Sequence, residues 1–204
     1  AKNGDEKWPN WNTVPLQTYQ GGLNAEPLSG GTPTGYYLKK YCQTAVDLRA
    51  GTASKTYHSW ITFRFGEFYL NYAEAVYKYL GSPYATDSEF TTSAVDAIKV
   101  VRTRAGMPGF PQGMTNDAFW KKYQNERMVE LAFEGHRFWD VRRWKEGDKH
   151  FKNIVEMKIT KNGDDIYTYE RKVKERSWDD KMYFFPIPQS EKSKNPNLEQ
   201  NPGW

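Results

Sequence analysis

Two glutamates that lie four residues apart are the side chains in this sequence that could do acid–base chemistry. Glu130 and Glu134 fall in a stretch of apolar residues with helical spacing, so their carboxylates would share one face of a helix. Such a pair could act as general acid and general base on a glycosidic bond. Hydrolysis of a glycoside is therefore one hypothesis for the function of this chain.

Arginines around the two glutamates favour a structural role instead. The planar guanidinium group of arginine pairs with a carboxylate through two parallel hydrogen bonds. The stretch holds four arginines and four carboxylates: Arg127, Arg137, Arg142 and Arg143, with Glu126, Glu130, Glu134 and Asp140. We interpret them as an ion-pair network, since charge clusters can shift pKa values without being catalytic. We assign no catalytic residue and expect no enzyme activity.

Other common catalytic and metal-binding patterns are missing from the sequence. His58, His136 and His150 lack the HExxH spacing, and Cys42 has no second cysteine for a disulfide or a metal site. The short motifs of serine hydrolases, P-loop NTPases and dinucleotide enzymes are also missing. We expect no metal and no cofactor, and we expect Cys42 to be a small buried residue.

The overall charge and hydropathy exclude two further classes of protein. The 204 residues include 29 basic and 25 acidic side chains, for a net charge of +4. Because the two signs are interspersed, we do not expect nucleic-acid binding, which needs a clustered basic surface. No run of about 18 apolar residues could form a transmembrane helix, and the amino terminus does not resemble a signal peptide. We expect a soluble chain.

The composition changes near residue 57. Residues 1–57 are rich in Gly, Pro, Asn and Thr, which predicts ordered loops with short extended pieces. From residue 58 onward, apolar residues recur at steps of three and four, which predicts helices. We therefore divide the chain into a loop-rich segment, 1–57, and a helical region, 58–204, and expect a single domain.

Four helices are predicted in the second region. The first should run for about five turns and end at Gly81. Its apolar residues are Phe65, Phe68, Tyr69, Tyr72, Val76, Tyr79 and Leu80. The second, capped by Ser88 or Thr92, should end at Gly106 and pair antiparallel with the first. The third should begin after residue 115 or 116, and the fourth should span His136–Glu146.

A β-hairpin and an irregular tail should follow these helices. Residues 154–160 and 166–173 alternate between apolar and polar, and Asn162-Gly163 between them is typical of a hairpin turn. The last 20 residues contain four prolines, which exclude a regular helix or a central strand. We expect an extended tail packed by five apolar side chains: Phe184, Phe185, Ile187, Leu198 and Trp204.

Aromatic residues near the loop-rich segment are the candidates for ligand binding. Binding residues are found disproportionately on loops, and a flat ring can stack on the apolar face of a sugar while polar neighbours bind its hydroxyl groups. The candidates are Trp8, Trp11, Tyr19, Tyr36, Tyr57 and Trp60. Aromatic residues at helical spacing, such as Tyr72 and Trp139, are expected to be packing residues.

Four blocks of sequence, in order along the chain, resemble the carboxy-terminal half of the SusD/RagB family. They are FRFGEFYLNYAEA at 63–75, AIKVVRTRAGMP at 97–108, NERMVELAFEGHRFWDVRRW at 125–144 and FFPIPQSEKSKNPNLEQNPGW at 184–204. The family comprises outer-membrane nutrient-capture lipoproteins of Bacteroidetes. The resemblance implies a mainly α fold of helical hairpins like tetratricopeptide repeats, with a small β-hairpin and extensive ordered loops.

The resemblance also implies a function, a location and a partner. It implies a surface-exposed lipoprotein of the outer membrane that binds an oligosaccharide without enzymatic turnover and passes it to a SusC-like TonB-dependent transporter. Because this chain shows neither a lipoprotein signal nor a cysteine near its start, we expect the lipid anchor to lie in a missing amino-terminal part. Neighbouring helical units would be missing as well, and their absence would expose an apolar face of this chain. The chain could form a homodimer through that face.

Two other functions remain open from the sequence alone. Stacked helical hairpins could form a protein-interaction module that holds a peptide in its groove. The hydrolase hypothesis requires turnover that disappears when Glu134 is changed to Gln. The sequence does not identify the glycan.

Overall fold

The structure is a computed structural model that describes residues 16–25, 32, 34–43, 57, 59–164 and 166–204. Its contacts group the chain into two units, Ser59–Asp140 and a second unit made of Ala1–His58 with Val141–Trp204. The described residues are mainly helical, with a two-stranded antiparallel sheet, which confirms the predicted fold class. The division into a ligand face at 1–57 and a helical region at 58–204 stays a prediction.

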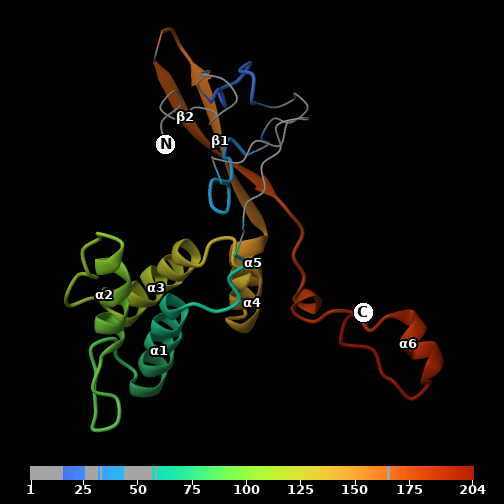
Figure 1. Cartoon of the computed structure of the whole chain (residues 1–204). Helices are drawn as coiled ribbons and strands as arrows, with labels where there is room; N and C mark the ends of the chain where they lie inside the picture. The colour runs from blue at the N-terminus through green and yellow to red at the C-terminus, as the bar shows by residue number, and fades with distance from the viewer. Residues whose placement is uncertain (1–15, 26–31, 33, 44–56, 58, 165) are drawn as a thin grey trace. The chain divides into compact units, whose positions relative to one another are not determined.

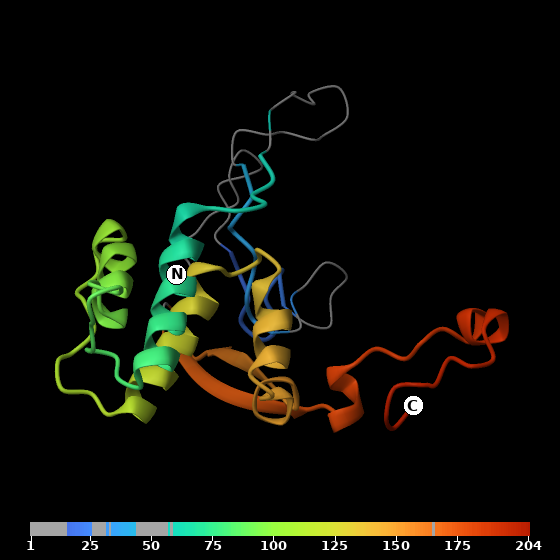
Figure 2. The same ribbon diagram turned by 90° about the horizontal axis from the view of Figure 1, so that it is seen from below.

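Three helices form the core of the unit Ser59–Asp140. They are α1 (Phe65–Leu80), α2 (Ala94–Arg104) and α3 (Asn116–Glu130). α1 packs against α2, as predicted, and also contacts α3; Figures 1 and 2 show the three helices lying side by side. The buried apolar residues include Leu70, Ala73, Val76, Ala97, Ile98, Val101, Phe119 and Tyr123. Their spacing of three and four along each helix produces one continuous core.

The buried face of α1 is not the aromatic face that the sequence predicts. Leu70 and Ala73 are fully buried, whereas Phe65, Phe68 and Tyr79 are 74%, 57% and 72% exposed. Two stripes run along this helix, one of small and aliphatic residues and one of aromatic residues, and both have helical spacing. Small side chains let α2 approach closely, so the small-residue stripe is buried and the aromatic stripe faces outward.

The cap of α2 lies one residue after Thr92 and five residues after Ser88, the two caps that the sequence predicts. The cap is Ser93, whose Oγ accepts a hydrogen bond from the backbone N–H of Asp96 at 3.2 Å. The first buried residue of the helix is Ala94, and a cap stands immediately before the first helical turn. Ser88 and Thr92, which the sequence predicts as caps, lie too early to serve this turn.

α3 begins as predicted, but the region after it differs from the prediction. Thr115 caps α3 by accepting a hydrogen bond from the N–H of Ala118 at 3.2 Å. α4 (His136–Arg143) ends before residue 146, because Lys145 adopts a left-handed conformation with φ of 54°, which a helix cannot continue through. A short helix that the sequence does not predict, α5 (Gly147–Phe151), follows at once.

The predicted β-hairpin is present. β1 (Asn153–Lys161) pairs antiparallel with β2 (Tyr167–Glu175) in a register that places Met157 opposite Arg171 (Figure 1). At the turn, the N–H of Asn162 donates to the carbonyl of Ile166 at 2.9 Å, and Gly163 has a φ of 138°. The Asn-Gly pair therefore lies at the turn, where a residue with positive φ is required.

The tail after β2 is not irregular throughout. It contains a 3-10 helix, η1 (Asp180–Tyr183), and a short helix, α6 (Gln189–Lys194), which corrects the prediction that the last 20 residues hold no regular helix. α6 fits because Pro188 precedes it and Pro196 follows it, so no proline lies within the helix. Phe184 and Phe185, which the sequence predicts as packing residues of the tail, are 60% and 59% exposed. Phe185 nevertheless contacts Arg142.

An aromatic cage around Arg142 attaches the start of the tail to the end of α4. The guanidinium carbon of Arg142 lies 5.4 Å from the ring centre of Phe151, 5.6 Å from that of Trp178 and 5.7 Å from that of Phe185. Contacts of this kind combine electrostatic attraction with apolar burial. Gly147 adjoins the cage, since a Cβ at this position would lie 1.9 Å from a ring carbon of Trp178. The indole ring can therefore pack only against a glycine.

Two surface features complete the description. None of the helices in the described parts of the chain is long and apolar enough to cross a membrane. Cys42 is exposed, and its Sγ lies 3.3 Å from the carbonyl oxygen of Leu38. The prediction that Cys42 is buried is wrong, because it lies in a surface loop and not on a packed helix.

Candidate functional site

A pocket forms where a loop of the amino-terminal segment packs on the edge of β1. The N–H of Gln20 donates to the carbonyl of Ile159 at 2.7 Å, and the N–H of Met157 donates to the carbonyl of Thr34 at 2.9 Å. These bonds satisfy the edge of β1 that β2 leaves open, as an added strand would. β1 therefore lies between β2 and the loop, and the pocket opens above it.

Gly35 allows the loop to approach β1 closely. Its φ is 79°, and a Cβ at this position would lie 2.4 Å from the carbonyl oxygen of Met157. Both the backbone conformation and the space therefore exclude any other residue. The loop carries a buried threonine on each side of its turn, Thr18 and Thr32, and the Oγ of Thr32 donates to the carbonyl of Tyr36 at 2.7 Å.

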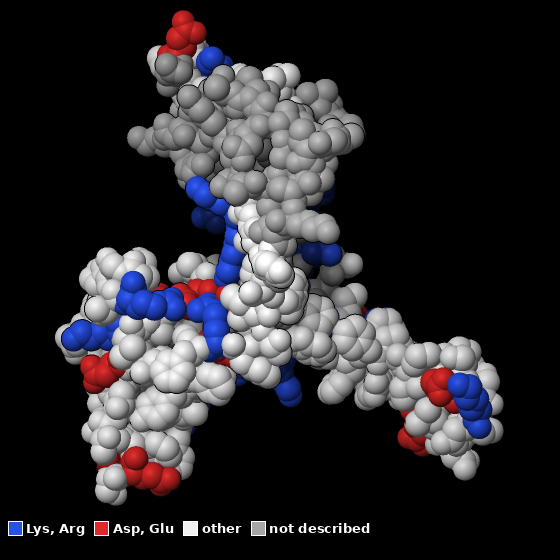
Figure 3. Space-filling model, in the orientation of Figure 1, with Lys and Arg blue, Asp and Glu red and all other residues white. Residues whose placement is uncertain are grey.

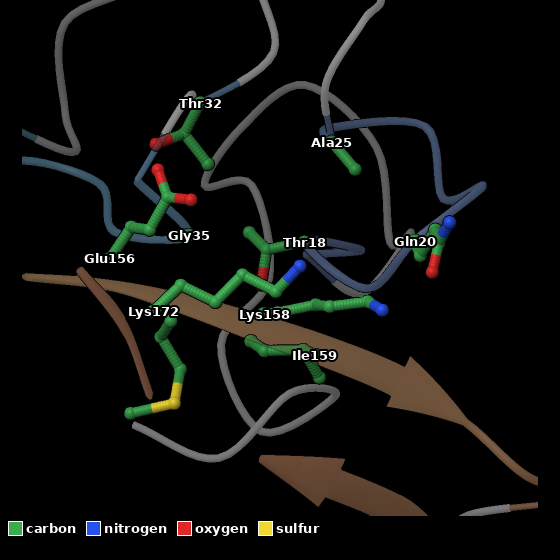
Figure 4. A pocket seen from close by; sticks show the side chains of 10 residues that line it. Thr18, Gln20, Ala25, Thr32, Gly35, Glu156, Lys158, Ile159 and Lys172 are labelled. Carbon is green, nitrogen blue, oxygen red and sulfur yellow. The ribbon is translucent and has the colours of Figure 1, made fainter. Parts of the chain in front are cut away.

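The pocket has a volume of about 220 Å³ and a lining of mixed polar and apolar residues. Its lining residues are Thr18, Gln20, Ala25, Thr32, Gly35, Glu156, Met157, Lys158, Ile159 and Lys172. Figure 4 shows the carboxylate of Glu156 on the side of Thr32, and the amines of Lys158 and Lys172 on the side of Thr18 and Gln20. Amine, amide and carboxylate groups can donate and accept hydrogen bonds, so the pocket suits a small polar ligand.

The charged lining residues come from one face of the hairpin. Glu156 is directly opposite Lys172, and Lys158 is directly opposite Glu170. Side chains two residues apart on a strand share a face, and opposed residues of an antiparallel pair share it too. The alternation of charge along both strands is visible in the sequence, but the loop that closes the pocket above them is not.

Two of the predicted ligand residues lie beside this pocket in the chain. Tyr36 follows Gly35 and is 58% exposed. Tyr19 lies between two lining residues, but its ring packs 5.8 Å from that of Tyr167. We interpret Tyr19 as a packing residue of the loop and Tyr36 as an exposed ring that adjoins the lining residue Gly35 in the sequence.

The other predicted ligand residues are distributed along the chain. Tyr57 is 99% exposed and Trp60 is 75% exposed, but they belong to different units. Trp8 and Trp11 lie outside the described residues. Among the candidates in the described residues, Tyr19 and Tyr36 are the two that adjoin lining residues of the pocket in the sequence. Ligand binding by any of the six stays a prediction.

The two glutamates that could do acid–base chemistry are held in ion pairs. Nε of Arg64 donates to Glu134 at 2.6 Å, and Nη1 of Arg64 donates to Glu130 at 2.5 Å. Arg104 also pairs with Glu130, at 2.6 Å. Burial opposes ionisation of Glu130, but the hydrogen bonds from Arg64 and Arg104 outweigh it and lower the pKa of this carboxyl group. A glutamate with a lowered pKa is a poor general acid near neutral pH.

The predicted ion-pair network exists with different arginines. Arg127 pairs with Asp140 at 2.6 Å, as the sequence predicts. For Glu126, the structure shows Arg102 of α2 as the partner; for Glu130 and Glu134 it shows Arg64, just before α1. Arginines from distant parts of the chain become neighbours only when the helices pack, so sequence proximity could not identify them.

Within the part of the chain that the structure describes, one face of the molecule and the groups of potential metal ligands show no further site. On the face in Figure 3, basic and acidic groups lie next to one another among wide uncharged areas. No group of three or more His, Cys, Asp or Glu in the described residues could hold a metal ion. The imidazole of His136 faces Glu67 at 3.6 Å, and that of His150 faces Glu146 at 2.8 Å.

Comparison with known proteins decides the family. The model of the SusD family matches residues 5–204, nearly the whole chain. This chain belongs to the SusD family. Of the solved structures it resembles, a SusD-like protein (BF3747) from Bacteroides fragilis NCTC 9343 is 28% identical with a TM-score of 0.74, over 97% of this chain and 36% of that protein. The family resemblance inferred from four sequence blocks is thus confirmed.

A second solved protein, BT4246, is 35% identical, with a TM-score of 0.60 over 76% of this chain and 25% of that protein. The SusD-family chain described here therefore spans only 36% and 25% of the length of these two relatives. A comparison with curated proteins found no match.

Proposed function

We propose that this SusD-family chain contributes to a surface protein that binds a glycan without turning it over. Proteins of this family are carbohydrate-binding proteins and not enzymes. The observation that carries the proposal to this chain is the pocket beside β1, which is lined by Glu156, Lys158 and Lys172. Tyr36, which follows the lining residue Gly35 in the sequence, is exposed.

The size and lining of the pocket match a single sugar unit. Its volume of about 220 Å³ is below the roughly 300 Å³ at which pockets for larger ligands begin. One residue of an oligosaccharide would occupy it, and the rest of the chain would continue over the surface. A tyrosine ring there can stack on the apolar face of the next sugar, much as aromatic rings stack on flat partners.

The same proposal extends to location and partner. We propose that the full-length protein is a lipoprotein of the outer membrane that delivers its glycan to a SusC-like TonB-dependent transporter. Family membership supports this part of the proposal. Co-purification of a full-length form with such a transporter, from membranes of the source organism, would test it; a full-length protein that never associates with one would contradict it.

Replacement of Tyr36 tests the binding surface. A glycan array would first identify a ligand of the folded chain, and calorimetric titration would then measure its dissociation constant. We expect Tyr36→Ala to weaken binding about tenfold, because stacked rings contribute about 1 kcal/mol or more. Tyr79→Ala is the matched control, since Tyr79 is 72% exposed and belongs to α1, in the unit that does not contain the pocket.

Two results would contradict the proposal. If circular dichroism shows the chain to be folded and it binds no glycan, the binding site does not lie in these 204 residues. Equal binding by the wild type and Tyr36→Ala would show that Tyr36 does not contribute to glycan binding.

A second candidate function rests on the outer face of α1. Phe65 and Phe68 of α1 are 74% and 57% exposed, and Phe63, two residues before the helix, is 72% exposed. Contiguous exposed apolar residues are a feature of protein-binding surfaces. A helical-repeat module that binds a peptide would use this face. Peptide binding that is lost in Phe65→Ser and Phe68→Ser, while glycan binding is unchanged, would favour this function.

A further inference from the structure

The positive and negative side chains of the pocket lie at opposite ends of it. The amines of Lys158 and Lys172 extend toward Thr18 and Gln20, and the carboxylate of Glu156 extends toward Thr32 (Figure 4). One end therefore carries two positive charges, and the other carries one negative charge. The three charges sum to +1.

Ion pairs neutralise the charges of Glu156, Lys158 and Lys172 only weakly. Glu156 and Lys172 are opposed in register, yet among the described residues no ion pair within 4 Å involves either of them. Lys158 reaches Glu170 only at 4.0 Å, in a pair whose side chains are 38% and 64% exposed. An ion pair so long and so exposed contributes little. The charged groups of Glu156, Lys158 and Lys172 can thus interact with a ligand.

We propose that the pocket binds a sugar unit that carries a carboxylate, as in a glycan of uronic acids. The carboxylate would lie between the amines of Lys158 and Lys172, and Glu156 would accept hydrogen bonds from hydroxyl groups at the other end of the ring. The amide of Gln20 is placed to bind a further hydroxyl group. This inference rests on the proposed glycan binding and specifies the class of glycan.

The charge distribution explains the preference for an acidic sugar. A neutral sugar would shield two amines from water without supplying an opposite charge, which is unfavourable. A carboxylate forms charge-assisted hydrogen bonds with both amines, and such bonds are roughly twice as strong as neutral ones. Glu156 disfavours a ligand with negative groups at both ends, because like charges in proximity repel.

Matched pairs of oligosaccharides test the inference. The probes are oligomers of galacturonic, glucuronic and mannuronic acid, each compared with its carboxyl-reduced form, which has the same linkages and no charge. Calorimetric titration of the full chain should show at least one acidic oligomer bound about tenfold or more tightly than its reduced form. The difference should shrink as sodium chloride is raised from low to high concentration, because salt screens exposed charges.

Charge-removing variants test the residues. Lys158→Gln and Lys172→Gln should each weaken binding of the acidic oligomer about tenfold and leave binding of the reduced form nearly unchanged. Lys174→Gln is the matched control, because Lys174 lies on the same strand, two residues from Lys172, and does not line the pocket. Circular dichroism would confirm that each variant is folded.

The possible outcomes separate this inference from the proposed function. Equal binding of acidic and reduced oligomers, or binding of neutral or sulfated glycans alone, would overturn the carboxylate site and leave glycan binding intact. Preference for an acidic oligomer that survives both lysine substitutions would place the carboxylate elsewhere and overturn the assignment of Lys158 and Lys172. A folded chain that binds no glycan of any class would overturn both proposals.

Discussion

At the scale of single residues, Arg64 is the group that holds Glu130 and Glu134. Its guanidinium group donates to both carboxylates and, through Nη2, to the backbone carbonyl of Glu130 at 2.5 Å. The side chain of Glu134 is 2% exposed and that of Glu130 is 13% exposed. Without Arg64, two buried carboxylates would lose their main counter-charge, which costs far more than the loss of a surface pair.

Arg64 and Arg104 form a matched test of this difference. We expect Arg64→Met to lower the free energy of unfolding by about 3 kcal/mol, because it leaves buried charge without a partner. Arg104 also pairs with Glu130, but its side chain is 57% exposed, so Arg104→Met should cost only about 0–1 kcal/mol. Urea unfolding followed by circular dichroism would measure both. Similar losses for the two variants would contradict a special role for Arg64.

At the scale of elements, short-range interactions fix the start of α2 and the end of α1. Ser93 is buried and makes two hydrogen bonds with Asp96, one from the backbone N–H at 3.2 Å and one to Oδ2 at 2.6 Å. The C-terminus of α1 is closed by Gly81 at φ of 72°, whose N–H donates to the carbonyl of Tyr77. Glycine adopts this left-handed conformation without a steric penalty.

The start of α2 can be tested by three substitutions. Ser93→Ala should lower the free energy of unfolding by about 1 kcal/mol, because the first turn of α2 loses its side-chain acceptor. Ser88→Ala and Thr92→Ala replace the residues that the sequence alone predicts as caps, and each should change stability by less than about 0.5 kcal/mol. Chemical denaturation of the three variants provides the measurement. A larger loss at Ser88 or Thr92 than at Ser93 would place the cap elsewhere.

At the scale of the whole molecule, the aromatic stripe of α1 is the feature that is least typical of a monomer. Its rings are exposed, although aromatic side chains bury the most apolar area of any residues. The predicted homodimer would cover this face. This chain covers only 25% and 36% of the two solved relatives, so in a full-length protein other residues could cover this face instead.

Self-association of this chain is the expected consequence. Light scattering at micromolar concentrations should detect a dimer, and Phe65→Ser with Phe68→Ser should shift it toward monomer, because the apolar area available for association is removed. Val100→Ser is the control, since Val100 is an exposed apolar residue of α2 at 46%. A wild-type chain that stays monomeric over this range would rule out the dimer.

The sequence by itself determined the class of fold, most of the helices, the hairpin and the family. These follow from local patterns: apolar spacing, glycine and proline punctuation, and the Asn-Gly turn. Tertiary structure alone decided which face of α1 is buried, which residue caps α2, and that Arg64 pairs with Glu130 and Glu134. It also decided the pocket, where a loop that includes Gly35 meets residues 156–159 of β1. Each of these outcomes depends on which distant segments approach one another, and local spacing carries no information about that approach.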